Sequence, residues 1–256
     1  MRARLRLALL LLPVLLALPA HADPLRVAAA ANLQKVFTDA LLPAFLKKTG
    51  VAVLPTFGAT KALATQIENG APVDVFVAAD TATVQKLAAE RVLVSSTVRP
   101  YAIGRLVLWS SAQAAHHPQR LQDLVAPVYA KIAIANPKTA PYGLAAEQAL
   151  TRVGIAPRVA PRIVQAENIG QALQFAQSRN ADVCLTALSL VIEDRTDPYV
   201  IVPDTLHDPL TQSLGLVRTT TQTTQALEFI DFLTSREAAK IWKRYGYELP
   251  KSPKTR

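Results

Sequence analysis

Short apolar runs rich in valine and isoleucine alternate along this chain with segments of helical period, and this alternation most restricts the fold. Such runs are typical of strands buried in a parallel sheet. The pattern therefore predicts an α/β fold with largely parallel sheet. The expected strands are residues 25–30, 51–57, 73–78, 105–110, 131–135, 162–165, 181–186, 199–202 and 213–217. The expected helices are residues 33–47, 61–69, 82–89, 144–153, 169–177 and 222–245, the last with a break near Ser235.

The expected elements fall into two sets. Those before residue 102 and those after residue 131 each resemble a separate βαβα unit, and residues 101–110 join them as an extended segment. We therefore expect two lobes with a cleft between them. Lobe I would contain residues 23–105 plus 214–256, and lobe II residues 106–213. This division requires the chain to cross back to lobe I before its last helices.

The N-terminal residues have the order of an export signal. A basic start, MRARLR, precedes an apolar run at residues 7–19, and an A-x-A sequence follows at residues 20–22. The run is too short for a comfortable membrane span, and a buried N-terminal helix is the alternative explanation. We therefore expect residues 1–22 to be a signal peptide that is removed, so that the mature protein begins at Asp23 in the periplasm. No cysteine stands directly after the signal, so no lipid anchor is expected.

The chain is basic, with a formal net charge of +9. Three of these charges belong to the arginines of the export signal, so six remain in the mature chain. A positive surplus suits an anionic ligand or a membrane surface, but the lysines and arginines are scattered. Because no basic run is present, we expect no nucleic-acid partner.

Cysteine and histidine are too few to build a metal site. Cys184 is the only cysteine, so the chain can form neither an internal disulfide nor a thiolate cluster, and it is expected to be a small buried hydrophobe. His21 leaves with the signal, His116 and His117 lie in a polar loop, and His207 stands alone. No cofactor and no bound metal cation are therefore expected.

Four strand-to-helix junctions carry residues suited to a helix N-terminus. These are Asn32, Thr60, the kinked loop at residues 136–143, and Asn168 before Ile169. A helix start leaves backbone N–H groups without partners and carries a partial positive charge, so several starts facing one cleft would bind an anion without a metal. In open α/β sheets the ligand crevice lies at the carboxyl ends of the strands, where these junctions fall. The sequence thus predicts an anion site shared by both lobes, which closure would complete.

Each junction alone also has an ordinary structural explanation. Asparagine and threonine are common N-caps, so Asn32 and Thr60 could simply cap their helices. Lys61 could be a solvated first-turn lysine, and Tyr142 could pack against its own loop. Only the coincidence of four junctions favours a binding site.

The same residues carry a resemblance to a known family. The chain is similar to the periplasmic molybdate/tungstate-binding proteins of ABC importers over essentially all of its mature length. The similar segments are residues 27–33 (VAAAANL), 57–80 (FGATKALATQIENGAPVDVFVAAD), 101–110 (YAIGRLVLWS), 135–144 (ANPKTAPYGL), 167–172 (ENIGQA) and 242–247 (WKRYGY). The segment at residues 66–80 is the most specific.

The resemblance implies a type II periplasmic binding-protein fold, with two α/β lobes and a double crossover. It also implies an oxyanion held by hydroxyl and backbone N–H groups, with molybdenum or tungsten present only inside that anion. Asn32 and Thr60 match the first two ligand positions of the family, where serine is usual. Tyr142 and Ile169 match positions that donate a backbone N–H group, and Ala31 could add its backbone. A monomer and a membrane permease as partner are further implications.

Two positions depart from the family pattern. Many members carry a tyrosine whose hydroxyl reaches the anion, and the matching position here is Ala187. Lys61 replaces a residue that is usually small, and it could add a charge-assisted hydrogen bond or shift the selectivity. The combination of Asn32, Tyr142 and the absent tyrosine resembles a distinct branch of the family, so binding need not be lost.

The function expected from these observations is capture of molybdate or tungstate and delivery to an ABC importer, without turnover. A pocket of donors only would reject phosphate, because phosphate often carries a proton that needs an acceptor. Glu167 would spoil this argument if its carboxylate pointed inward. Selection against sulfate depends on cavity size, which the sequence does not give.

Three other functions remain as alternatives. Sulfate, thiosulfate or a small organic anion could be the ligand, although an organic acid usually needs a bidentate arginine and none lies in the four junctions. A hydrolytic enzyme would need a motif such as G-x-S-x-G, H-E-x-x-H or G-x-x-x-x-G-K-[ST], and the sequence has none of these. The sensor domain of a transcription regulator would need a helix-turn-helix where the export signal lies.

Overall fold

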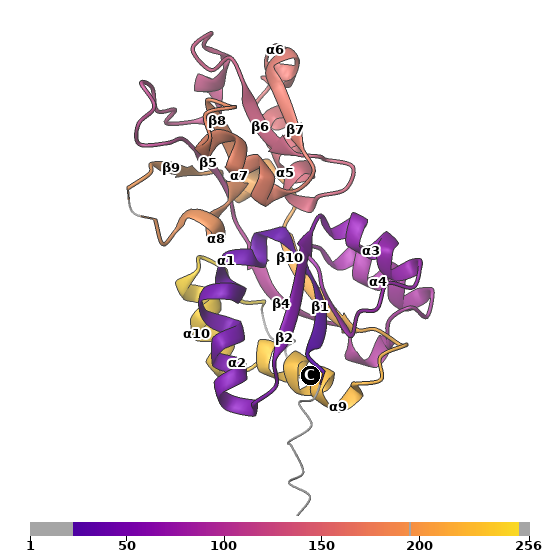
Figure 1. The fold of residues 1–256 in the computed structure, drawn as a ribbon. Helices are drawn as coiled ribbons and strands as arrows, with labels where there is room; N and C mark the ends of the chain where they lie inside the picture. The colour runs from indigo at the N-terminus through magenta and orange to yellow at the C-terminus, as the bar shows by residue number, and fades with distance from the viewer. Residues whose placement is uncertain (1–22, 195, 251–256) are drawn as a thin grey trace, which may run out of the picture.

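The computed structural model describes residues 23–194 and 196–250, and in this part of the chain the strands form two five-stranded sheets (Figure 1). The first sheet has the order β2-β1-β3-β10-β4 and the second β7-β6-β8-β5-β9. The predicted two-lobed α/β fold is therefore confirmed. The predicted signal peptide lies outside the described residues.

The strands of the first sheet are β1 (Leu25–Ala30), β2 (Val53–Gly58), β3 (Val75–Val77), β4 (Arg99–Gly104) and β10 (Leu210–Leu216). Those of the second are β5 (Leu106–Trp109), β6 (Ile132–Ala135), β7 (Ile163–Ala166), β8 (Val183–Ala187) and β9 (Tyr199–Ile201). β1 pairs in parallel with β2 and β3, and β6 with β7 and β8, whereas β10 and β5 run antiparallel to their neighbours.

The register of the parallel pairs brings the strand ends together. Ala30 at the end of β1 lies opposite Gly58 at the end of β2, and Ala135 at the end of β6 lies opposite Ala166 at the end of β7. Because both members of each pair end at the same level, the helices that follow them start side by side. This register places two predicted junctions together in each lobe.

The chain crosses between the sheets twice. The predicted extended segment at residues 101–110 contains the expected strand, β5 in the second sheet, and also the end of β4 in the first sheet, which was not predicted as a strand; Arg105 separates the two. The chain returns between β9 and β10. Because β10 begins at Leu210, residues 210–213, which the sequence assigned to lobe II, pair with the first sheet. The rest of the lobe boundaries stay a prediction.

Helices cover both sheets. The longer ones are α2 (Leu42–Thr49), α3 (Thr60–Glu68), α4 (Thr81–Ala89), α5 (Pro141–Arg152), α7 (Ile169–Gln177), α9 (Thr223–Leu233) and α10 (Arg236–Arg244). The sequence did not predict the short α6 (Ala156–Val159) and α8 (Leu188–Val191). No helix within the described ranges is both long and apolar enough to cross a membrane.

The first predicted helix, residues 33–47, is irregular in the structure. It opens with a 3-10 turn, η1 (Ala31–Leu33), passes through α1 (Gln34–Val36) and a π turn, η2 (Phe37–Leu41), and ends in α2. Pro43 lies in the first turn of α2, immediately after the π turn. A proline inside a helix lacks an N–H group and clashes with the carbonyl four residues earlier, which explains the widened turn.

The C-terminal helices pack on the first lobe, as the sequence predicted. Phe229 of α9 is fully buried, with ring centroids 4.9 Å from Phe45 and 6.2 Å from Phe37. Trp242 of α10 is also buried, 5.0 Å from the ring of Tyr101 in β4. The predicted break is confirmed too, since Ser235 caps α10 by accepting a hydrogen bond from the Ala238 N–H group.

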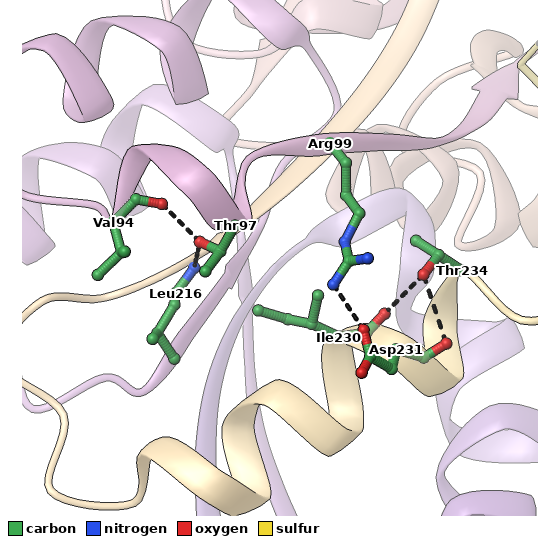
Figure 2. A network of polar contacts seen from close by, with 7 residues as sticks. All are labelled: Val94, Thr97, Arg99, Leu216, Ile230, Asp231 and Thr234. Atoms are coloured by element: carbon green, nitrogen blue, oxygen red, sulfur yellow. Dashed lines mark hydrogen bonds and ion pairs between the residues drawn. The ribbon is translucent and has the colours of Figure 1, made fainter. Parts of the chain in front are cut away.

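Polar contacts add a second tie between β4, β10 and α9 (Figure 2). The Thr97 hydroxyl donates to the Val94 carbonyl at 2.6 Å and accepts from the Leu216 N–H group at 3.0 Å. Arg99 forms an ion pair with Asp231 at 2.6 Å. This pair is exposed to solvent, so it stabilises the fold by at most about 1 kcal/mol, and the aromatic contacts dominate.

Removal of the Phe229 ring should therefore weaken the docking of the C-terminal helices. We expect Phe229→Ala to lower the free energy of unfolding by about 3–5 kcal/mol, because a buried aromatic ring is replaced by a cavity. Urea denaturation would measure it. Glu228→Ala, at the exposed neighbouring position, should change the same quantity by less than about 0.5 kcal/mol. If both variants lost the same free energy of unfolding, the Phe229 ring would not be what holds the C-terminal helices on the first lobe.

Candidate anion-binding site between the lobes

A small cavity lies where the four strand-to-helix junctions meet. Its lining from the first lobe is Ala30, Ala31, Asn32, Gly58, Ala59, Thr60 and Ala79, and from the second lobe Ala140, Pro141, Tyr142 and Ile169. A water-sized sphere can place its centre in only about 10 Å³ of it, which is close to the room that one water needs. The structure thus brings together Ala31, Asn32, Thr60, Tyr142 and Ile169, all predicted site residues.

Three helix starts border this cavity. α3 begins at Thr60, α5 at Pro141 and α7 at Ile169, and the N–H groups of a first turn have no partner inside their own helix. Gly143 allows α5 to start so close to the end of β6, since a Cβ atom there would lie 2.3 Å from the Ala135 carbonyl oxygen. Asn168 caps α7 by accepting a hydrogen bond from the Gln171 N–H group, as expected.

Thr60 does not cap its helix, contrary to the capping explanation. The N-cap position of α3 belongs to Ala59, and Thr60 is the first residue inside the helix. The buried Thr60 Oγ1 accepts a hydrogen bond from the Ala79 N–H group at 3.0 Å. Because this bond uses an acceptor site only, the hydroxyl proton stays available to a ligand in the cavity.

Asn32 is not a cap either. It lies inside the 3-10 turn η1, whose N-cap is Ala30, and only 1% of its surface is exposed. Its Nδ2 donates to Gln212 Oε1 at 3.0 Å and to the Tyr247 hydroxyl at 2.8 Å. Its backbone carbonyl accepts from the Ser189 hydroxyl at 2.8 Å, a contact between the lobes. Asn32 Oδ1, by contrast, is buried without a hydrogen-bond partner.

A buried polar cluster behind the cavity was not predicted. Gln212 of β10 is fully buried, with Oε1 2.7 Å from the Tyr101 hydroxyl and Nε2 3.1 Å from the Tyr142 hydroxyl. Tyr142 belongs to lobe II, so this contact joins the lobes. One signal was visible in the sequence, a glutamine beside a strand-like stretch, but our predicted strand began at Ser213 and left Gln212 outside it.

Comparison with known proteins identifies the family. The model of the bacterial extracellular solute-binding proteins matches residues 25–248. The chain belongs to this family. It is 37% identical to the molybdate-binding protein ModA of Azotobacter vinelandii over 92% of this chain and 94% of that protein. It is 36% identical to ModA of Rhodobacter capsulatus over 91% of each chain. The solved periplasmic molybdate-binding protein of A. vinelandii superposes with a TM-score of 0.84 at 33% identity, over 89% of this chain and all of that one.

The remaining predicted positions lie outside the cavity of this solute-binding protein. The exposed Lys61 lines a neighbouring cavity of about 160 Å³, together with Asp80 and Gln148. Its backbone N–H group donates to the Thr139 carbonyl at 3.1 Å. Glu167 is exposed and is not among the lining residues, so its carboxylate does not face the cavity. Ala187 is buried at the end of β8.

Metal coordination has no structural support in the described ranges. Nowhere in residues 23–194 and 196–250 do three or more histidine, cysteine, aspartate or glutamate side chains gather as possible ligands. Cys184 is buried as predicted, and burial raises the pKa of its thiol, which keeps it protonated.

The three tyrosine hydroxyls of the cluster are neutral. Burial raises the pKa of Tyr142 and of Tyr101 well above the usual value, and the charges that neighbouring tyrosines and Asp80 would carry raise that of Tyr101 further. Burial likewise raises the pKa of Tyr247. In this solute-binding protein they therefore act as hydroxyl donors and acceptors.

The raised pKa values predict a loss of stability in alkali. The unfolded tyrosines release protons above about pH 10 while the folded ones keep theirs, so the free energy of unfolding should fall as the pH rises through that value. Tyr142→Phe should make the fall less steep, because one of these groups is removed. Urea denaturation between pH 8 and 11 measures both slopes. If the free energy of unfolding of Tyr142→Phe fell with pH as steeply as that of the unmodified protein, the Tyr142 hydroxyl would not be buried and neutral in the folded state.

Proposed function

We propose that the protein captures a tetrahedral oxyanion, molybdate or tungstate, in the periplasm and delivers it to the permease of an ABC importer. The cavity between the lobes would hold the anion, with Asn32, Thr60, Tyr142 and Ile169 as its ligands and Ala31 as an additional backbone contact. We further propose that the protein acts as a monomer and releases the anion unchanged.

The free hydroxyl proton of Thr60 carries this proposal most directly. Its oxygen accepts from the Ala79 N–H group, which leaves the hydroxyl proton to donate to an anion in the cavity. The starts of α5, where Tyr142 carries the first N–H group, and of α7 at Ile169 would add backbone N–H donors and the positive end of two helix dipoles from the opposite lobe. Such a set of donors matches an anion without protons, and the relatives named above are molybdate-binding proteins.

Lobe closure would complete the site. Contacts already link the lobes around the cavity, among them Ser189 to the Asn32 carbonyl and Lys61 N–H to the Thr139 carbonyl. Since the cavity has room for little more than one water, the lobes must separate to admit an oxyanion. The ligand would then select the closed arrangement, because only this one offers donors from both lobes.

Other anions remain the competing ligands. Sulfate and thiosulfate have the same charge and similar shape, and only the size of the closed cavity would exclude them. A small organic acid would lack the bidentate arginine that usually binds a carboxylate, because the cavity lining contains no arginine. Phosphate near neutral pH would need an acceptor for its proton.

Calorimetric titration of the chain from Asp23 onward tests the ligand. We expect binding of molybdate and tungstate, and no heat from sulfate, thiosulfate or phosphate at the same concentrations. Heat from one of these anions alone would sink the assignment to molybdate, and silence from all five would sink the proposed function.

A threonine variant tests the site. Thr60→Ala should weaken binding about ten- to hundredfold, since a hydrogen bond to a charged group contributes roughly 1.5–3 kcal/mol. Thr65→Ala is the matched control, because Thr65 lies exposed on the same helix, with its hydroxyl bonded to the Lys61 carbonyl. Its affinity should equal that of the unmodified protein. Equal affinities for all three proteins would remove Thr60 from the site.

A further inference from the structure

The Asn32 carboxamide, beside the cavity, has its acceptor end without a partner and its donor end fully used. Its Nδ2 is used on the inner side, by Gln212 and Tyr247, so the end left for the cavity is Oδ1, which is buried and has no partner. Burying an acceptor without a partner costs free energy, because the group loses its water and gains no hydrogen bond. An oxyanion without protons could not relieve this cost, because it offers no donor.

A half-turn of Asn32 alone does not solve the problem. It would place Oδ1 against Gln212 Oε1, so that two acceptors would meet where a hydrogen bond now exists. Gln212 must therefore turn as well. The orientation of a buried carboxamide follows from its hydrogen-bond partners. Asn32 and Gln212 are partners, so the orientation of one determines the orientation of the other.

With both carboxamides turned, each acceptor of the cluster can have a donor. The Tyr247 hydroxyl, which now donates to the Asn32 carbonyl at 3.0 Å, would donate to Asn32 Oδ1 instead, and the carbonyl would keep the Ser189 hydroxyl as its donor. Gln212 Nε2 then has two protons to give, one to Asn32 Oδ1 and one to the Tyr101 hydroxyl. The Tyr101 hydroxyl at present faces two acceptors with a single proton, Gln212 Oε1 at 2.7 Å and the Ala78 carbonyl at 3.0 Å. In the turned arrangement its proton goes to Ala78. The Tyr142 hydroxyl donates to Gln212 Oε1, and Asn32 Nδ2 faces the cavity.

We propose that Gln212 is a positioning residue for the binding site, which holds the Asn32 carboxamide with its Nδ2 toward the anion. Gln212 does not line the cavity, and its bond to Asn32 is the contact through which it would set the group that faces the anion. Because its other end bonds to Tyr142 of the opposite lobe, the orientation that suits the anion also depends on lobe closure. This inference rests on the proposed function, since it explains how an asparagine can serve a site made of donors.

Proton NMR of the unmodified mature chain, with isotope-labelled side-chain amides, reads the orientation directly. In the turned arrangement the Nε2 protons of Gln212 lie beside the Tyr101 ring, and otherwise they lie beside Tyr142. With saturating molybdate we expect nuclear Overhauser contacts from Gln212 Nε2 to Tyr101. We also expect the Asn32 Nδ2 protons to shift on addition of the anion. Contacts to Tyr142 instead of Tyr101 would overturn the proposal.

A double-mutant cycle tests the action through Asn32. We expect Gln212→Leu and Asn32→Ala each to weaken molybdate binding about ten- to hundredfold, and the double variant to bind no more weakly than Asn32→Ala alone. Gln85→Leu, at an exposed position on α4, is the control and should bind as the unmodified protein does. Losses that multiply in the double variant would overturn the positioning role, whatever the effect of Gln212→Leu on folding.

The two proposals fail in different ways. If the unmodified protein binds none of the five anions, the proposed function fails and the positioning role fails with it. If the unmodified protein binds molybdate, but Gln212 contacts Tyr142 or the losses multiply, the function stands and only the role of Gln212 is overturned.

Discussion

The structure depends on the satisfaction of backbone N–H groups at the places where parallel strands end and helices begin. Each such start leaves several donors without a partner in its own helix. The register of β1 with β2 and of β6 with β7 gathers these starts in pairs, and the two lobes bring the pairs together around one cavity. A ligand that accepts hydrogen bonds and donates none would satisfy the remaining donors. The anion preference would then follow from the geometry of the backbone more than from charged side chains.

Much of this arrangement could be predicted from the sequence. Apolar runs predicted the strands, mostly to within two or three residues, because buried strands need continuous apolar surface and the helices between them show their own period. The convergence of four junctions also follows from the sequence, since the carboxyl ends of parallel strands share one edge of a sheet. The docking of the C-terminal helices on the first lobe was only permitted by the sequence, because their return needed a second crossing that no residue pattern required.

The side-chain bonds of the site could not be predicted in the same way. Asn32 and Thr60 look like ordinary N-caps in the sequence, but their partners are Gln212, Tyr247 and the Ala79 N–H group, which come from distant parts of the chain. Local propensity describes neighbours in sequence only, so it assigned a local role to residues whose bonds are long-range. The π turn before Pro43 was not predicted either. The proline is a local signal, but the sequence does not show whether the helix ends, bends or widens to accommodate it.

The double crossing of the chain between the lobes limits how the cleft can open. Two connections join the lobes, one at Arg105 and one between β9 and β10 (Figure 1). A single connection would allow the lobes to rotate about several axes, whereas two connections would restrict this rotation. An opening motion would then be close to a rotation about one axis, so the opposite walls would meet again in the same alignment each time. A ligand slightly too large would keep the lobes from closing fully. A membrane partner that recognises only the fully closed conformation would then reject the complex without contacting the ligand.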